Sequence, residues 1–137
     1  MKYEIIEHTA DVGVKAYGDS IEECFENVAK AMFDIIVDDG VVDCVVEKDV
    51  VIEGHDYEDL LFSWLSELVY IHHAELMLFT RFDVKIEENN EIKLRAKICG
   101  EKIDFKKHKI GLDIKAVTYH MLEVNAEEGY VQVIFDI

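Results

Sequence analysis

The order in which helical and strand patterns follow one another constrains the fold of this chain most. Apolar residues recur at helical spacing from Ile21 to Ile36, behind a capping box that starts at Ser20. They recur again from Leu60 to Ile71, behind a candidate N-cap at Asp56. With the strand patterns around them, the order is ββαβαββββ. Because helices and strands do not alternate regularly, we expect an α+β fold with a mostly antiparallel or mixed sheet and two amphipathic helices packed on it.

The strand patterns differ in how clear they are. Residues 92–98 alternate apolar side chains with Lys and Arg, which predicts a strand with one buried and one solvated face. We expect strands over residues 76–88, 116–124 and 130–135 as well, and a polar, irregular connection over residues 100–111. Without linkers, repeats or proline, the 137 residues predict a single domain, 1–137.

The charge of the chain limits its partners. There are 14 Lys and Arg against 30 Asp and Glu, which gives a formal net charge of −16. This balance excludes a simple electrostatic nucleic-acid binder, because phosphate contacts need basic side chains, and it disfavours a membrane surface. It suits hard cations or a basic protein partner. With no apolar run of bilayer length and no leader pattern at the start, we expect a cytoplasmic protein.

The cysteines do not suggest a disulfide framework. Cys24, Cys44 and Cys99 are odd in number and contain no CxxC pair. We therefore expect three small hydrophobic residues in a reducing compartment.

Carboxylates gather at the C-terminal end of the sequence. An apolar strand pattern over residues 133–135 runs directly into Asp136 and Ile137, so the side-chain and chain carboxylates lie one residue apart. Two such anions repel each other unless a cation joins them. If the first and last strands are sheet neighbours, Asp11 supplies a third oxygen donor. Oxygen ligands favour Ca²⁺ or Mg²⁺ over zinc, so the pattern indicates a divalent-metal site.

Several histidines and lysines have open interpretations. His8 and Asp11 are either metal ligands or a hydrogen-bonding residue and a turn residue. The basic stretch 101–109 is either a solvated loop or a contact to a phosphate or an acidic partner. His120 fits a packed strand histidine better than a general base. The pair at 72–73 fits a helix end. With no Gly-rich phosphate loop, HExxH or GxSxG motif, nothing in the sequence indicates an enzyme.

Three blocks, taken together, resemble a known family. The first is His-Thr-Ala-Asp-Val-Gly at residues 8–13, followed by Gly18 and a capped helix that ends in Ala-Met-Phe. The second is residues 59–70, and the third runs from Gly100 to residue 137. In order and spacing they are similar to the archease family over essentially the whole chain. Tyr130 stands where many relatives have Trp, which keeps an aromatic ring.

The resemblance implies an accessory protein rather than a free-standing enzyme. Archeases assist the RNA-splicing ligase that joins 2′,3′-cyclic-phosphate or 3′-phosphate ends in tRNA splicing. They promote guanylylation of the ligase and its multiple turnover, and they can broaden its choice of nucleoside triphosphate. The family has also been linked to tRNA cytosine-5 methylation, as a chaperone-like modulator of the methyltransferase.

The resemblance also implies particular site residues. Asp11, Asp136 and the Ile137 carboxylate would bind a divalent cation, with Ca²⁺ expected and Mg²⁺ or Mn²⁺ as alternatives. Four further residues match family motif positions and are candidates for activating the partner: His8, Asp104, His108 and Lys115. A metal-dependent hydrolase that uses the same carboxylates is a third interpretation, but no nucleophile or base is fixed beside them by sequence.

Overall fold

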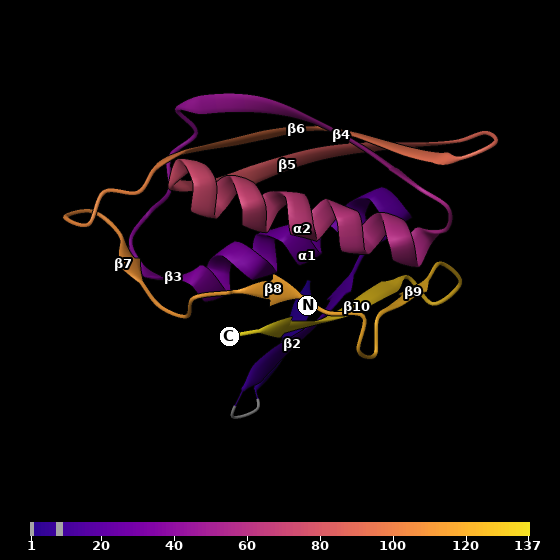
Figure 1. Ribbon diagram of the computed structural model, residues 1–137, viewed down its shortest axis with the longest axis horizontal. Helices are drawn as coiled ribbons and strands as arrows, with labels where there is room; N and C mark the ends of the chain where they lie inside the picture. The colour runs from indigo at the N-terminus through magenta and orange to yellow at the C-terminus, as the bar shows by residue number, and fades with distance from the viewer. Residues whose placement is uncertain (1, 8–9) are drawn as a thin grey trace.

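The computed structural model describes residues 2–7 and 10–137 and has the expected α+β architecture, with two helices and antiparallel strands (Figure 1). The elements in chain order are β1 (Tyr3–Glu7), β2 (Asp11–Tyr17), α1 (Ile21–Ile36), β3 (Val37–Asp39), β4 (Val46–Gly54), α2 (Tyr57–Glu75), β5 (Met77–Glu88), β6 (Ile92–Lys102), β7 (Lys109–Ile110), β8 (Ala116–Val117), β9 (Glu123–Asn125) and β10 (Tyr130–Asp136).

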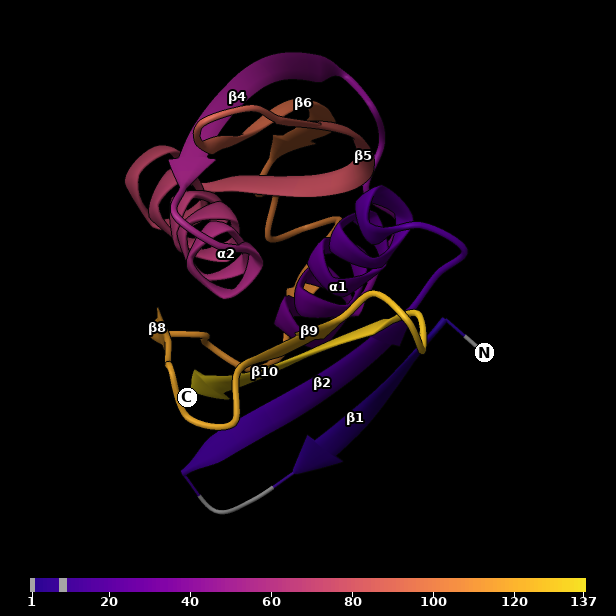
Figure 2. The ribbon, with the colours of Figure 1, turned by 90° about the vertical axis from the view of Figure 1, so that its right-hand side faces the viewer.

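The strands form two main sheets, with the helices between them (Figure 2). One sheet has the order β1-β2-β10-β8, with β9 also paired to β10, and the other has the order β4-β6-β5. Helix α1 packs on β5, β2 and β10, whereas α2 packs on β4, β6 and β8. No helix in the described part of the chain combines the length and apolar character needed to cross a membrane.

Local sequence signals place both helices. The Ser20 hydroxyl accepts a hydrogen bond from the Glu23 amide (3.0 Å), and the Asp56 carboxylate accepts one from the Asp59 amide (2.7 Å). Each side chain thus satisfies an amide that the first helical turn leaves without a partner. Trp64 lies at the centre of the core, where its Nε1–H donates to the Phe25 carbonyl across the two helices (3.1 Å).

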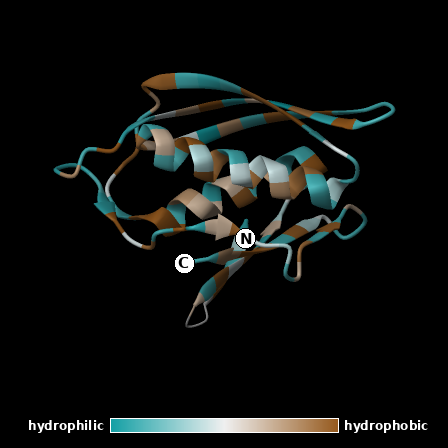
Figure 3. Ribbon diagram, viewed as in Figure 1, coloured by the Kyte–Doolittle hydropathy of each residue, from teal (hydrophilic) through white to brown (hydrophobic). Residues whose placement is uncertain are grey.

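The alternation over residues 92–98 also behaves as predicted. Ile92, Leu94, Ala96 and Ile98 are buried, and the intervening basic side chains are partly or fully exposed. The same alternation of polar and apolar residues is visible along the long strands in Figure 3.

Two expectations about the second half of the chain were wrong. Residues 116–124 form no continuous strand: β8 ends at Val117, the chain turns through Met121 in the left-handed region (φ 53°), and β9 follows. The Thr118 side chain favours this turn by donating to the Ile134 carbonyl (2.9 Å) and accepting from the His120 amide (3.3 Å). The stretch 100–111 is partly regular, because β6 continues to Lys102 and β7 pairs with β3.

The cysteine expectation also needs correction. Cys44 and Cys99 form a disulfide, with their Cα atoms 5.0 Å apart, and only Cys24 is a free, buried thiol. The Val45 amide donates to the Gly100 carbonyl (2.9 Å), so the pairing of β4 with β6 already begins beside the two cysteines. This long-range register, which sequence spacing does not reveal, brings the two sulfur atoms together.

Candidate functional site

The pairing of β2 with β10 brings two predicted carboxylates together. The strands are antiparallel, and Asp11 lies directly opposite Asp136 at the end of their ladder. The Ile137 amide donates to the Ala10 carbonyl (3.4 Å), so the chain remains beside β2 after β10 ends. Asp11, Asp136 and Ile137 are therefore neighbours at one end of the sheet. We name these three residues the carboxylate end.

One oxygen of this group lacks a partner. Asp11 Oδ1 is buried and accepts no hydrogen bond from the described residues, which is costly for a carboxylate oxygen. A hard cation is the kind of ligand that such an oxygen accepts, so the donor set fits a divalent metal. Within residues 2–7 and 10–137, no three His, Cys, Asp or Glu side chains cluster as a metal site. Of the described groups, the main-chain carboxylate of Ile137 is the natural third donor to a cation beside Asp11 and Asp136.

Lys115 lies next to this group. Its amide donates to the Asp136 carbonyl (2.8 Å), and its neighbour Ala116 pairs with Asp136 in the β8–β10 ladder. The Lys115 side chain is exposed and lines a groove of about 540 Å³ between α2 and β8. Sequence analysis did not predict this groove. The sequence of residues 59–70 could have indicated it, because this block has more apolar side chains than one buried helix face accommodates.

Asp104 and His108, in contrast, close a loop between β6 and β7. His108 is buried, and its Nδ1 accepts a hydrogen bond from the Asp104 amide (3.0 Å). Because Nδ1 is an acceptor, Nε2 carries the proton and donates to Glu101 (3.0 Å). The Asp104 carboxylate accepts a hydrogen bond from the Lys106 amide (3.0 Å). The main-chain carbonyl of Asp104 accepts hydrogen bonds from the amides of Lys107 and His108. Every one of these contacts holds the loop in shape.

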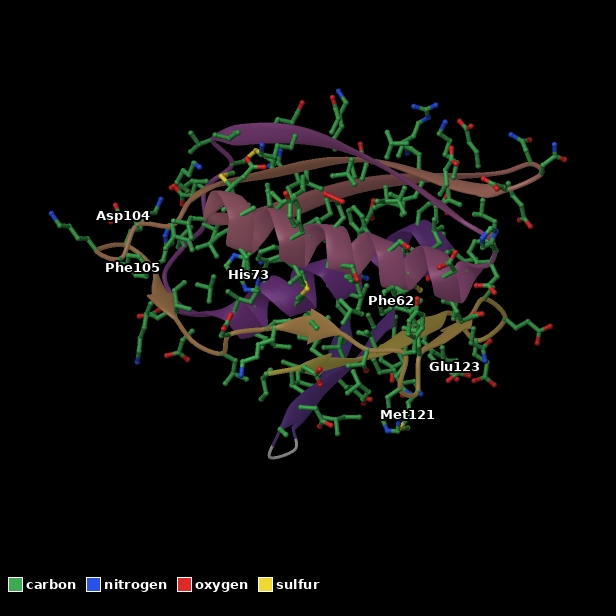
Figure 4. The ribbon with its side chains drawn as sticks, viewed as in Figure 1. Phe62, His73, Asp104, Phe105, Met121 and Glu123 are labelled. Atoms are coloured by element: carbon green, nitrogen blue, oxygen red, sulfur yellow. A yellow bond between two sulfur atoms is a disulfide. The ribbon has the colours of Figure 1, made fainter. Side chains whose placement is uncertain are left out.

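Glu101 is the anchor of this loop. Burial opposes ionisation of its carboxylate, but hydrogen bonds from Lys107, the Asp43 amide and His108 outweigh burial and lower its pKa to about 2. Lys107 also pairs with the Asp43 carboxylate. Lys107, in the basic stretch 101–109, therefore contacts acidic groups of its own chain. These contacts favour the interpretation of this stretch as a solvated loop. The loop containing Asp104 lies at one end of the molecule, away from the C-terminus (Figure 4).

Comparison with known proteins identifies the family. The sequence profile of the Archease protein family matches residues 3–137. The chain is 46% identical to Protein archease of Pyrococcus furiosus over 124 residues, which cover 90% of this chain and 87% of that protein. The chain belongs to the archease family. It is also 42% identical to the archease of Methanosarcina mazei over 140 residues, covering 99% and 96% of the two chains.

A solved structure supports the same conclusion. The solution structure of Methanobacterium thermoautotrophicum protein 1598 superimposes on this archease with a TM-score of 0.86, at 40% identity, over 99% of both chains. The resemblance drawn from the three sequence blocks is therefore confirmed, and the α+β fold with it.

The other histidines considered in the sequence have separate places in this archease. His8 lies outside the described residues. His72 is buried at the end of α2, where its Nδ1 lies 2.8 Å from the Met77 carbonyl and burial lowers its pKa. His73 contacts Asp113 (3.1 Å), so the pair belongs to a helix end as expected. His120 is exposed in the turn after β8, and the interpretation as a packed strand histidine was wrong.

Proposed function

We propose that this archease is a non-catalytic accessory protein that activates an RNA-splicing ligase in tRNA splicing. It would promote guanylylation and multiple turnover of the ligase and alter the nucleoside triphosphates that the ligase accepts. The observation that carries the proposal is the opposition of Asp11 and Asp136 at the end of the sheet, with a buried carboxylate oxygen that has no partner among residues 2–7 and 10–137. The family membership supplies the class of partner.

The proposal includes a divalent cation at the carboxylate end. Asp11, Asp136 and the carboxylate of Ile137 would hold it, with Ca²⁺ first and Mg²⁺ or Mn²⁺ as alternatives. A bound cation would offset the repulsion between these anions and present a positive centre to an anionic group of the partner complex. Asp11 Oδ1 supports this assignment, because the part of the chain that the structure describes supplies no hydrogen-bond donor to this buried oxygen.

The charge of the chain supports a protein partner over direct RNA binding. With a net charge of −16, this archease would meet the ligase while the ligase holds the RNA. Among the candidates for activating the partner, Lys115 is exposed beside the carboxylate end, and Asp104 and His108 are occupied within their loop. We therefore assign the contact with the ligase to the carboxylate end and Lys115.

Ligation of a 3′-phosphate RNA by the purified ligase, with substrate in large excess, tests the proposal. We expect wild-type archease to convert a single-turnover burst into sustained ligation, and Asp136→Ala to lose this effect. Asp83→Ala removes an exposed carboxylate from the opposite sheet and should behave as wild type. A fully active Asp136→Ala protein would contradict the role of the metal site.

Two other outcomes would change the functional assignment. If wild-type archease adds nothing to a competent ligase, a chaperone-like role for a tRNA cytosine-5 methyltransferase takes first place. Its test is protection of that enzyme from aggregation by both wild type and Asp136→Ala. If the archease alone hydrolyses phosphoesters, it is a metal-dependent hydrolase instead.

A further inference from the structure

Helix α2 has two apolar faces, and the fold covers the second only in part: Val69 is buried and Phe62 half-buried, whereas Tyr70 and Ala74 are exposed. Leu61, Trp64, Leu65 and Leu68 are fully buried in the core. A second stripe, spaced by about one helical turn, lines the groove between α2 and β8: Phe62, Ser66, Val69, Tyr70, His73 and Ala74. Tyr70 in this stripe is 66% exposed. A helix that is apolar on both sides normally has a neighbour on both sides.

The opposite wall of the groove is the edge of a sheet. Residues 115–117 line it, and β8 ends the strand order β1-β2-β10-β8. The outer edge of a terminal strand is where an extended segment of another chain can pair. Towards one end of α2, Phe62 stacks on Tyr119 at a ring separation of 3.9 Å, and towards the other end His73 contacts Asp113. Figure 4 shows Phe62 and His73 along the side of α2 that faces β8.

The dimensions of the groove suit a short peptide. Phe62 and His73 are eleven helical residues apart, which corresponds to roughly 16 Å along the helix axis. About five residues of extended chain span this length. The groove has a volume of about 540 Å³ and is lined mainly by aromatic and aliphatic side chains, with Lys115 as its one lysine or arginine. That lining suits apolar side chains better than a polyphosphate or a nucleic-acid backbone.

We propose that this groove binds an extended segment of the ligase, about five residues long, which carries an apolar anchor side chain flanked by Lys or Arg. This inference rests on the proposed function. The basic flanks are required by the net charge of −16 and by the exposed Asp113 and Asp136 near the groove. Ala116 lines the groove and pairs with Asp136, so the groove lies next to the carboxylate end and one partner surface would reach both.

The affinity of purified ligase for archease variants, measured by titration calorimetry, tests the groove. We expect Tyr70→Asp to weaken binding at least tenfold, because it replaces an exposed aromatic ring of the apolar groove with an anion. Val51→Asp is the matched control. It adds the same charge at a residue that is 52% exposed on β4 of the other sheet, and it should bind as wild type. Thermal melts must show that both variants are folded like wild type.

The outcomes separate the groove from the proposed function. If Tyr70→Asp binds as tightly as wild type while Asp136→Ala still loses stimulation of ligation, the groove proposal falls and the proposed function stands. If wild-type archease does not bind the ligase, both fall. If Tyr70→Asp and Val51→Asp weaken binding equally, added negative charge explains the loss and the groove proposal is overturned.

A photo-crosslinking amino acid at position 70 identifies the segment itself. We expect it to crosslink one short apolar segment of the ligase with Lys or Arg on its flanks, and the same probe at position 51 to give no such product. Crosslinks scattered over the ligase surface would contradict a defined occupant.

Discussion

The carboxylate end and the β6–β7 loop contain the same kinds of charged residue, but their hydrogen bonding differs. In the loop, Glu101, Asp104 and His108 each have partners within the chain, and burial of His108 is matched by two good contacts. At the carboxylate end, Asp11 is paired in the strand register with another acid, and one of its oxygens is buried with no donor from the described residues. A motif residue whose bonds are satisfied internally serves the fold. Asp11, which faces another acid and receives no hydrogen bond within the described residues, points to a cation instead.

The largest effect is expected from the disulfide that joins Cys44, just before β4, to Cys99 in β6, two residues before Glu101. Asp43, which bonds to Glu101 and Lys107, directly precedes Cys44. The bond closes a sequence separation of 55 residues, so we expect the Cys44→Ser, Cys99→Ser double variant to lose about 4 kcal/mol in the free energy of unfolding. Urea denaturation measures this. A reductant should destabilise wild type by a similar amount and leave the double variant unchanged; an equal effect on both would contradict it.

His108→Ala is expected to have the next largest effect. It removes a buried ring and leaves the Asp104 amide and the Glu101 carboxylate each short of one partner, at a cost of about 2–3 kcal/mol. The His108→Ala variant should bind Ca²⁺ as wild type does, because His108 lies in the β6–β7 loop and not at the carboxylate end. Loss of Ca²⁺ binding by a folded His108→Ala protein would break the distinction between the two regions.

Glu101 gives the loop a pH dependence. Its pKa of about 2 lies below the ordinary 4.5, so the folded chain binds this proton less tightly than the unfolded chain. The stabilisation is therefore fully present above pH 4.5 and is lost as the pH falls towards 2. The difference in free energy of unfolding between wild type and Glu101→Gln should stay constant above about pH 5 and shrink as the pH falls from about 5 to about 2. A constant difference would mean that the charge of Glu101 does not hold the loop.

Asp104→Asn is expected to have the smallest effect. The Asn side-chain oxygen can still accept the hydrogen bond from the Lys106 amide, so stability should change by less than about 0.5 kcal/mol. Asp104→Ala loses that acceptor and should cost about 1 kcal/mol by the same measurement. Equal losses in the two variants would show that the charge of Asp104, and not its turn geometry, matters.

The elements that short-range sequence patterns determine were predicted correctly. The capping residues Ser20 and Asp56 and the alternation over 92–98 fixed the helices and the central strand of the second sheet. The disulfide and the β3–β7 pairing depend on registers between distant segments, which no local pattern encodes. The turn at Met121 was missed because a left-handed residue other than Gly gives no turn signal.

The same distinction applies to the site. The carboxylates could be selected from the sequence because they follow an apolar strand, but their opposition came from the β2–β10 register. The structural role of Asp104 and His108 could not be predicted, because a motif position does not show whether its hydrogen bonds are satisfied. The groove was missed because an apolar stripe does not reveal which of its residues the core leaves exposed.

Titration calorimetry with Ca²⁺ tests whether the carboxylate end is the metal site. Asp136→Asn and Asp104→Asn make the same chemical change and remove the same charge, one at the carboxylate end and one in the loop. We expect wild type and Asp104→Asn to bind one Ca²⁺ with equal affinity, and Asp136→Asn to bind it at least tenfold more weakly. Equal binding by Asp136→Asn and wild type would contradict the assignment of the carboxylate end as the metal site.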